Sequence, residues 1–140
     1  MIEGILDGVS LALAGAFPDC RVYGDERVRQ GLQTPSFFVG LGECNLRPLP
    51  GGLLEQRQFV EVVYFPARQG DHGELWGVGP KALGLLGELR LGDESMVRGR
   101  GLRCEVNDGL MYIRAVYTLR LRPRESERAL MEDLRLRFGV

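Results

Sequence analysis

The spacing of apolar positions changes along this chain, and each spacing predicts one kind of secondary structure. From Ile2 to Phe17 apolar residues recur every three or four positions, the repeat of an amphipathic helix, and Pro18 ends it. The same spacing returns over residues 74–91, where Pro80 marks either a kink or the first helical turn. The pattern therefore predicts two helices that are far apart in the sequence.

Alternating and β-branched stretches between and after these helices predict strands. The clearest is a hairpin of residues 102–107 and 110–121 about Asp108-Gly109, because both turn positions tolerate a positive φ. Alternation along residues 110–121 predicts that Ile113, Tyr117 and Leu119 face the helices, whereas the other face is mixed. Residues 54–65 include FVEVVYF, whose two apolar faces predict that the middle of this strand is covered on both sides. The other predicted strands are residues 21–24, 36–45 and 134–138. The predicted loops and turns are residues 25–34, 47–52, 66–73 and 123–128, with residues 92–101 a loop or a ragged strand.

These elements follow the order α-β-β-β-α-β-β-β, without an internal repeat or a linker. The order predicts an α+β fold in which two helices pack on one face of a mixed, mainly antiparallel sheet. A chain of 140 residues suits one domain with a real core, so we expect residues 1–140 to form a single domain. If only two helices cover the sheet, strands with two apolar faces would leave some apolar surface exposed.

Charge and cysteine content narrow the function classes. A net charge of −1 gives no overall field that would hold nucleic acid or an anionic membrane. The odd number and wide spacing of Cys20, Cys44 and Cys104 indicate reduced thiols in a cytoplasm-like compartment. Glu3 and Asp7 interrupt the apolar N-terminal stretch, so it is not read as a secretory signal, and no apolar run is long enough to span a membrane.

Candidate chemistry is sparse. His72 is the only histidine, which excludes a histidine-rich metal site, and an exposed loop position explains it more simply than a catalytic pair does. A zinc site built from the cysteines, with or without His72, is not favoured by their spacing. Gly77, Gly79, Gly84 and Gly87 match no phosphate-binding pattern, and helix packing explains them. We therefore expect no enzyme activity, no cofactor, and no catalytic, cofactor-binding or metal residues.

Several local phrases occur in an order that is shared with a known family. The first helix ends in Ala16-Phe17-Pro18-Asp19, residues 23–39 read YGDERVRQGLQTPSFFV, and residues 59–66 read FVEVVYFP. A polar loop, a second helix, a Gly-Arg-Gly segment and the Asp-Gly hairpin follow. Over nearly the whole chain this series resembles the tail-terminator, or tail-completion, proteins of long-tailed phages and prophages.

The resemblance implies a structural assembly protein that works by interface geometry. It implies a self-assembled ring, usually a hexamer, that caps the finished tail tube and joins it to the head connector. The expected partners are other copies of the chain, the tail tube protein and the head–tail connector protein, without membrane or sequence-specific nucleic acid. The expected location is the host cytoplasm during assembly and then the tail or neck of the virion. The alternatives are a small-ligand-binding α+β domain, a generic protein-interaction module, or a prophage remnant.

Two segments are candidates for ring contacts. The stretch RPLPGG is stiffened by its prolines, which lowers the entropy lost on binding. The stretch VRGRGLR is a dense basic segment, and its arginines could meet an acidic pair on a neighbouring copy. The predicted interaction residues are Arg47, Pro48, Leu49, Pro50, Arg98, Arg100, Asp25 and Glu26. The alternative is that all of these positions are simply solvated loops.

Overall fold

The computed structural model describes residues 2–24, 33–92 and 94–122. Its elements are α1 (Ile2–Ala16), β1 (Arg21–Gly24), β2 (Ser36–Pro48), a 3-10 turn (Pro50–Gly52), β3 (Leu54–Phe65), α2 (His72–Gly87), β4 (Glu88–Arg90), β5 (Met96–Asn107) and β6 (Leu110–Leu121). The predicted α+β class and the order α-β-β-β-α-β-β-β are confirmed.

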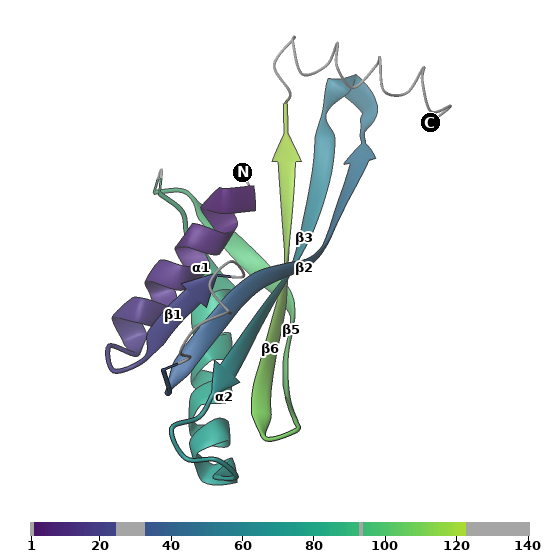
Figure 1. The fold of residues 1–140 in the computed structure, drawn as a ribbon. Coiled ribbons are helices and arrows are strands. Elements are labelled where there is room, and N and C mark those ends of the chain that lie inside the picture. Colours follow the sequence, from purple (N-terminus) through teal and green to yellow (C-terminus); the bar gives the residue numbers. More distant parts are fainter. Residues whose placement is uncertain (1, 25–32, 93, 123–140) are drawn as a thin grey trace.

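The six strands form one mixed sheet in the order β1-β2-β3-β6-β5-β4 (Figure 1). Only β1 and β2 run parallel, and every other neighbouring pair is antiparallel. Both helices lie on the same side of this sheet, which we call the helix face, and the opposite side is the open face. The predicted two-helix cover of one face is therefore confirmed.

The core lies between the helices and the central strands because each element contributes one apolar stripe. Along α1 the fully buried residues Ile5, Val9 and Leu13 recur every fourth position, which places them on one side of the helix. The N-terminus of α2 is capped by Asp71, whose side chain accepts a 3.0 Å hydrogen bond from the Glu74 backbone N–H.

The strand β3 is covered on one face only within the described part of the chain. Val60, Val62 and Tyr64 are buried beneath the helices, whereas Phe59 and Phe65 on the open face are half-buried. The prediction of cover on both faces is therefore wrong for the open face. The physical reason is that both described helices pack on the same face of the sheet, and no described helix lies across the other.

The hairpin predicted about Asp108-Gly109 is confirmed. Asp108 has φ 51° and Gly109 has φ 75°, the conformations that this dipeptide was expected to adopt. Ile113 and Tyr117 of β6 are fully buried on the helix face, and Leu119, farther along the same face, is half-buried. The alternation that predicted the strand therefore also predicted which side faces the core.

Several element boundaries differ from the prediction. The second helix ends at Gly87 instead of residue 91, because residues 88–90 pair as β4 with the start of β5. The same pairing makes Met96 the start of a strand, so the predicted loop or ragged strand over residues 92–101 is in large part regular β5. Pro80 lies inside α2, so the reading that placed it in the first turn is wrong. The predicted strand at residues 134–138 lies outside the described residues.

Two buried phenols make stability depend on alkaline pH. The Tyr117 hydroxyl donates a 2.7 Å hydrogen bond to the Leu86 carbonyl, and burial raises the pKa of Tyr117 above its ordinary value of 10.0. Burial and a hydrogen bond to Glu74 likewise raise the pKa of Tyr64. Both pKa values are higher in the folded state than in the unfolded state. The contribution of the two phenols to the unfolding free energy is therefore complete below about pH 10 and is lost as the pH rises above it.

We expect Tyr117→Phe to show this linkage. At pH 7 the variant should lose about 1 kcal/mol of unfolding free energy, because the buried Leu86 carbonyl loses its donor. Above about pH 10 the variant should lose stability less steeply than the wild type, since one buried phenol no longer ionises on unfolding. Urea unfolding at a series of pH values measures both effects, and identical pH dependence in the two proteins would contradict the assignment.

Candidate interaction surface

The sheet continues past the two helices as a three-stranded arm (Figure 1). The arm consists of residues 43–48 of β2, 54–57 of β3 and 118–121 of β6, which pair in continuous register. Every residue of β2 from Gly42 to Pro48 is exposed, whereas residues 36–39 at the start of the strand are buried. The β2 part of the arm therefore contributes little to the core.

The end of the arm is a closed turn. Gly51 and Gly52 have φ values of 79° and 77°, which favour glycine, and the Leu49 N–H donates a 2.8 Å hydrogen bond to the Leu53 carbonyl. The guanidinium of Arg47 pairs with the Glu55 carboxylate across the hairpin. The structure thus places the predicted residues 47–50 together at the tip, with the charge of Arg47 partly engaged inside the hairpin.

The two faces of the arm differ in character. On the helix face Leu46 is 49% exposed, and Cys44 beside it is also exposed. On the open face the arm carries Glu43, Arg47 and Glu55. An exposed apolar side on a strand that projects from the core is a feature of surfaces that bind another protein.

The predicted arginines lie far from the tip. Arg98 and Arg100 are exposed on the open face of β5, and β3 and β6 separate this strand from β2. Arg98 lies 3.9 Å from the Glu88 carboxylate, a pair with both side chains largely exposed that contributes little to stability. The structure therefore gives two separate candidate contacts, and the predicted acidic pair at residues 25–26 lies outside the described residues.

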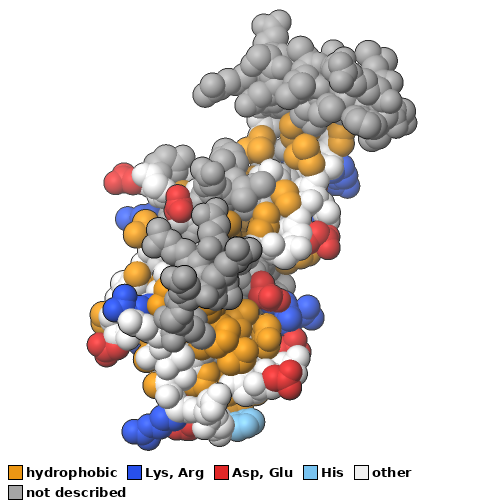
Figure 2. Space-filling model, viewed as in Figure 1, with side chains coloured by type: hydrophobic (Ala, Val, Ile, Leu, Met, Phe, Trp, Pro, Cys, Tyr) orange, Lys and Arg blue, Asp and Glu red, His pale blue; other side chains and the backbone are white. Residues whose placement is uncertain are grey.

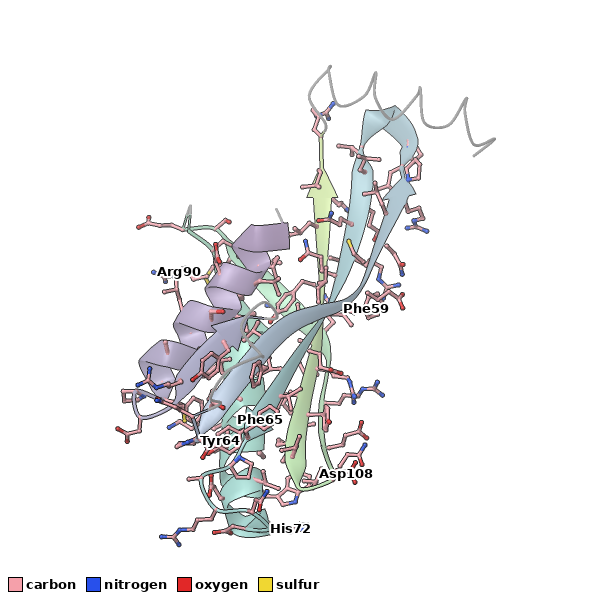
Figure 3. The ribbon with its side chains drawn as sticks, in the orientation of Figure 1. Phe59, Tyr64, Phe65, His72, Arg90 and Asp108 are labelled. Carbon is pink, nitrogen blue, oxygen red and sulfur yellow. The ribbon has the colours of Figure 1, made fainter. Side chains whose placement is uncertain are left out.

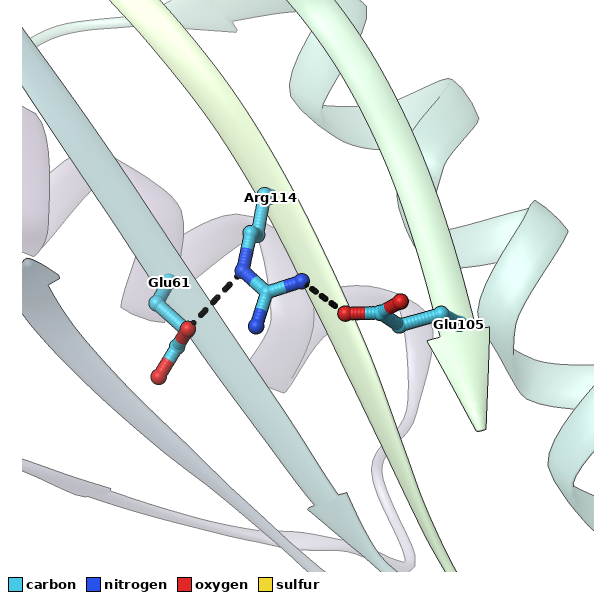
Figure 4. Close-up of polar contacts among 3 residues, drawn as sticks. All are labelled: Glu61, Glu105 and Arg114. Carbon is cyan, nitrogen blue, oxygen red and sulfur yellow. Dashed lines mark hydrogen bonds and ion pairs between the residues drawn. The ribbon is translucent and has the colours of Figure 1, made fainter. Parts of the chain in front are cut away.

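A row of charges on the open face was missed by the sequence reading. Arg114 lies between two carboxylates, with its Nε 2.9 Å from Glu61 Oε2 and its Nη1 hydrogen-bonded to Glu105 (Figure 4). The hydrogen bond and the charge of Arg114 lower the pKa of Glu105. The arginine also lies 5.5 Å above the ring of Tyr112. Sequence alternation marked this face of β6 as mixed, but only the register across β3, β6 and β5 shows which charges meet.

A groove crosses the open face at the level of two strand irregularities. Its volume is about 460 Å³, and Gly42 of β2 and Gly101 of β5 lie beside it. Phe59 and Val116 line it, together with Glu43, Val60, Glu61, Arg103, Arg114 and Ala115. Because the described lining residues include no serine, cysteine, threonine or histidine, they supply no nucleophile–base pair of the usual kinds.

Aromatic side chains form a further feature of the open face. The ring of Phe38 stacks on Tyr23 at 5.3 Å and meets Phe65 edge-on at 5.0 Å. Figure 2 shows hydrophobic side chains gathered on this face between the arm and the β5–β6 turn. Figure 3 places Phe65 near the start of β2 and Phe59 closer to the arm.

The remaining candidates for chemistry from the sequence are His72 and the three cysteines. His72 is the exposed first residue of α2, not part of the preceding loop as predicted, and it lies at the end of the molecule opposite the arm (Figure 3). All three cysteines are free. Among the residues that the structure describes, no three histidine, cysteine or acidic side chains gather as a metal site would need. The described helices are also too short or too polar to cross a membrane.

Comparison with known protein families gives a match that covers most of the chain. The sequence profile of a family described as phage tail terminator protein matches residues 4–129. This match includes both helices almost completely and every strand from β1 to β6. No curated protein sequence matches the chain.

Proposed function

The chain belongs to the phage tail terminator protein family, because the family profile matches most of its sequence, and we propose that this protein acts as a ring that caps the tail tube and joins the tube to the head connector. Proteins of this family are structural components of the phage tail and not enzymes, and they interact with the tail tube. We propose further that residues 1–140 are one domain, that the ring is a hexamer, and that it assembles in the host cytoplasm before entering the virion neck.

The observation that supports a ring best is the arm. A ring requires one patch on each subunit that meets a different patch on the next, a heterologous contact that closes. The arm projects from the helix-covered part of the fold, and it exposes Leu46 on one face and charges on the other. Its tip at residues 47–50 is held by the Leu49–Leu53 hydrogen bond, so it loses little entropy when it docks.

Complementation with labelled protein tests the capping function. In a phage that lacks this gene, the supplied protein should restore tails that carry heads. Protein labelled with gold should appear at one end of each tail tube in electron micrographs. Label distributed along the tube, or tails that join heads normally without the protein, would contradict the proposed cap.

Charge reversal at Arg98 and Arg100 tests the second candidate contact. We propose that these exposed guanidinium groups contact a neighbouring subunit or the tube, so the double change to Glu should block ring formation or tail completion. The unfolding free energy should change by no more than about 1 kcal/mol, since Arg98 makes only a weak surface pair.

The matched control is the double change of Arg68 and Arg90 to Glu, which alters the net charge equally at two other exposed positions. Light scattering measures the assembled mass, and electron microscopy counts completed tails. If the Arg98 and Arg100 variant assembles and completes tails as the control does, these arginines lie outside the interface. The proposed capping function would still stand in that case.

A further inference from the structure

We propose that the sheet continues from one subunit to the next, with the open edge of β2 in the arm of one copy pairing with the open edge of β5 in another copy. This inference rests on the proposed ring and names the contact that closes it. The occupant of each edge is therefore a second copy of this chain.

The two edges are open because the outermost strands are short. β1 pairs with β2 only over residues 36–39, and β4 pairs with β5 only over residues 88–90 against 96–98. Beyond those pairs, residues 43–47 and 103–107 have no backbone partner on their outer side among the described residues. Rows of unpaired N–H and C=O groups on such segments are templates for pairing with another chain.

The side chains on the two edges match in pattern. Leu46 on β2 is 49% exposed and Leu102 on β5 is 38% exposed. Both lie on the helix face: Leu46 aligns with Gln56, and Leu102 lies against Gly87 and Gly99 at the end of α2. Edge pairing would bring these two leucines together and remove both from water.

The open face of each edge carries charge instead. Glu43 and Arg47 lie on the β2 edge, and Arg103 and Glu105 lie on the β5 edge. The two edges therefore share one orientation, apolar toward the helices and charged on the other side. A sheet built across the boundary keeps that orientation in both subunits.

The topology makes this contact heterologous. β2 and β5 are separated by β3 and β6, so the two edges are different patches on opposite sides of the sheet. They run antiparallel within one subunit, because β2–β3, β3–β6 and β6–β5 are each antiparallel. Rotation about an axis along the strands keeps each strand's direction, so β2 of one copy meets β5 of the next as an antiparallel pair, and the series can close.

The positions of the open segments also require neighbouring subunits to be offset. Gly99 aligns through Tyr117 and Gln58 with Cys44, which places the open part of β5 nearer the β5–β6 turn and the open part of β2 in the arm. Pairing them shifts each copy along the strand direction relative to the previous one. Closed sheets have such an offset, because their strands tilt relative to the barrel axis.

Native cysteines provide the test. Cys44 is exposed on the β2 edge and Cys104 is half-buried on the β5 edge, and both lie on the helix face. In a Cys20→Ser background, a short bismaleimide should link Cys44 of one copy to Cys104 of the next. The expected product on a denaturing gel is a ladder of dimers, trimers and larger species up to the size of the ring.

Single-cysteine variants distinguish this contact from a symmetric one. Adding Cys44→Ser or Cys104→Ser to the background should abolish the ladder, because each link then lacks one partner. Strong dimers formed through Cys44 alone would indicate pairing of β2 with β2 and overturn the proposal. Leu46→Lys should lower the cross-linked fraction about tenfold. Leu11→Lys, at a position that is 72% exposed on α1, should not lower it.

The assembled mass is measured on the same samples by light scattering. A ring that gives no Cys44–Cys104 link overturns the edge pairing, while the proposed ring stands. If the protein stays monomeric both in solution at high concentration and when it is bound to tail tubes, the proposed ring is wrong. The ladder together with a ring mass supports both.

Discussion

Ile113→Asp is expected to lower the unfolding free energy by about 4 kcal/mol or more, which is enough to unfold most molecules of a marginally stable domain. Ile113 is fully buried at the centre of the helix face, between Val62 of β3 and Cys104 of β5. An aspartate there would be either an unpaired buried charge or a neutral acid held at a raised pKa, and both lower stability. Urea unfolding followed by circular dichroism measures the loss.

The control lies on the same strand. Thr118 is exposed on the open face of the arm, so Thr118→Asp should change the unfolding free energy by less than about 1 kcal/mol. If both substitutions had similar small effects, the helix face of β6 would not be the core. Equal large effects would show instead that the arm contributes much more to stability than its exposure indicates.

Gly99→Ala is expected to have the next largest effect, a loss of about 3 kcal/mol. An added Cβ at this position would lie 2.3 Å from the Leu86 carbonyl oxygen, and 3.2 Å from both Leu102 Cδ2 and Tyr117 Cε1. The first of these contacts is with backbone, so the end of α2 would have to move away from β5. That movement would also disturb the hydrogen bond from Tyr117 to Leu86.

Gly84→Ala is the matched control for this prediction. Gly84 is exposed within α2, and nothing lies within 4 Å of the position that its Cβ would take. Alanine there should raise the unfolding free energy by about 0.5–1 kcal/mol, because the unfolded chain loses freedom and the helix gains a better helix former. A Gly99→Ala variant as stable as the wild type would show that β5 does not press against α2 as described.

The two predictions concern the helix-covered part of the fold, which carries the stability, whereas the β2 side of the proposed ring contact lies in the arm, outside that part. Substitutions in the arm, such as Leu46→Lys, should therefore alter assembly with little change in the stability of the monomer. This separation makes assembly testable, because an interface variant should remain folded. It also suits a protein of the tail terminator family, whose members interact with the tail tube.

Local sequence patterns determined the elements whose signals lie within a few residues. The stripe Ile5, Val9 and Leu13 predicted α1, and the alternation of β6 predicted which side of that strand is buried. The Asp108-Gly109 turn could be predicted from its own two residues. The ordered motifs also indicated the family that the profile match then showed.

The candidate site was predictable only in part. The turn at residues 47–52 identified the tip, because proline and glycine act locally. The sequence could not show that the strands on either side of this turn extend beyond the helices. It also could not show that Arg98 and Arg100 lie across the sheet from that tip. Those facts depend on strand order, which local spacing does not encode.

Tertiary structure alone decided the features that depend on distant pairing. Residues 88–90 leave the helical spacing because they pair with the start of β5, so α2 ends at Gly87. Arg114 meets Glu61, which lies 53 residues earlier in the chain, only because β3 and β6 pair in one register. A shift of one residue in that register would turn either side chain to the other face. The sequence by itself determined which residues could form strands and helices. Long-range strand register decided which charged side chains meet and which strand edges stay open, because local periodicity carries no signal for that register.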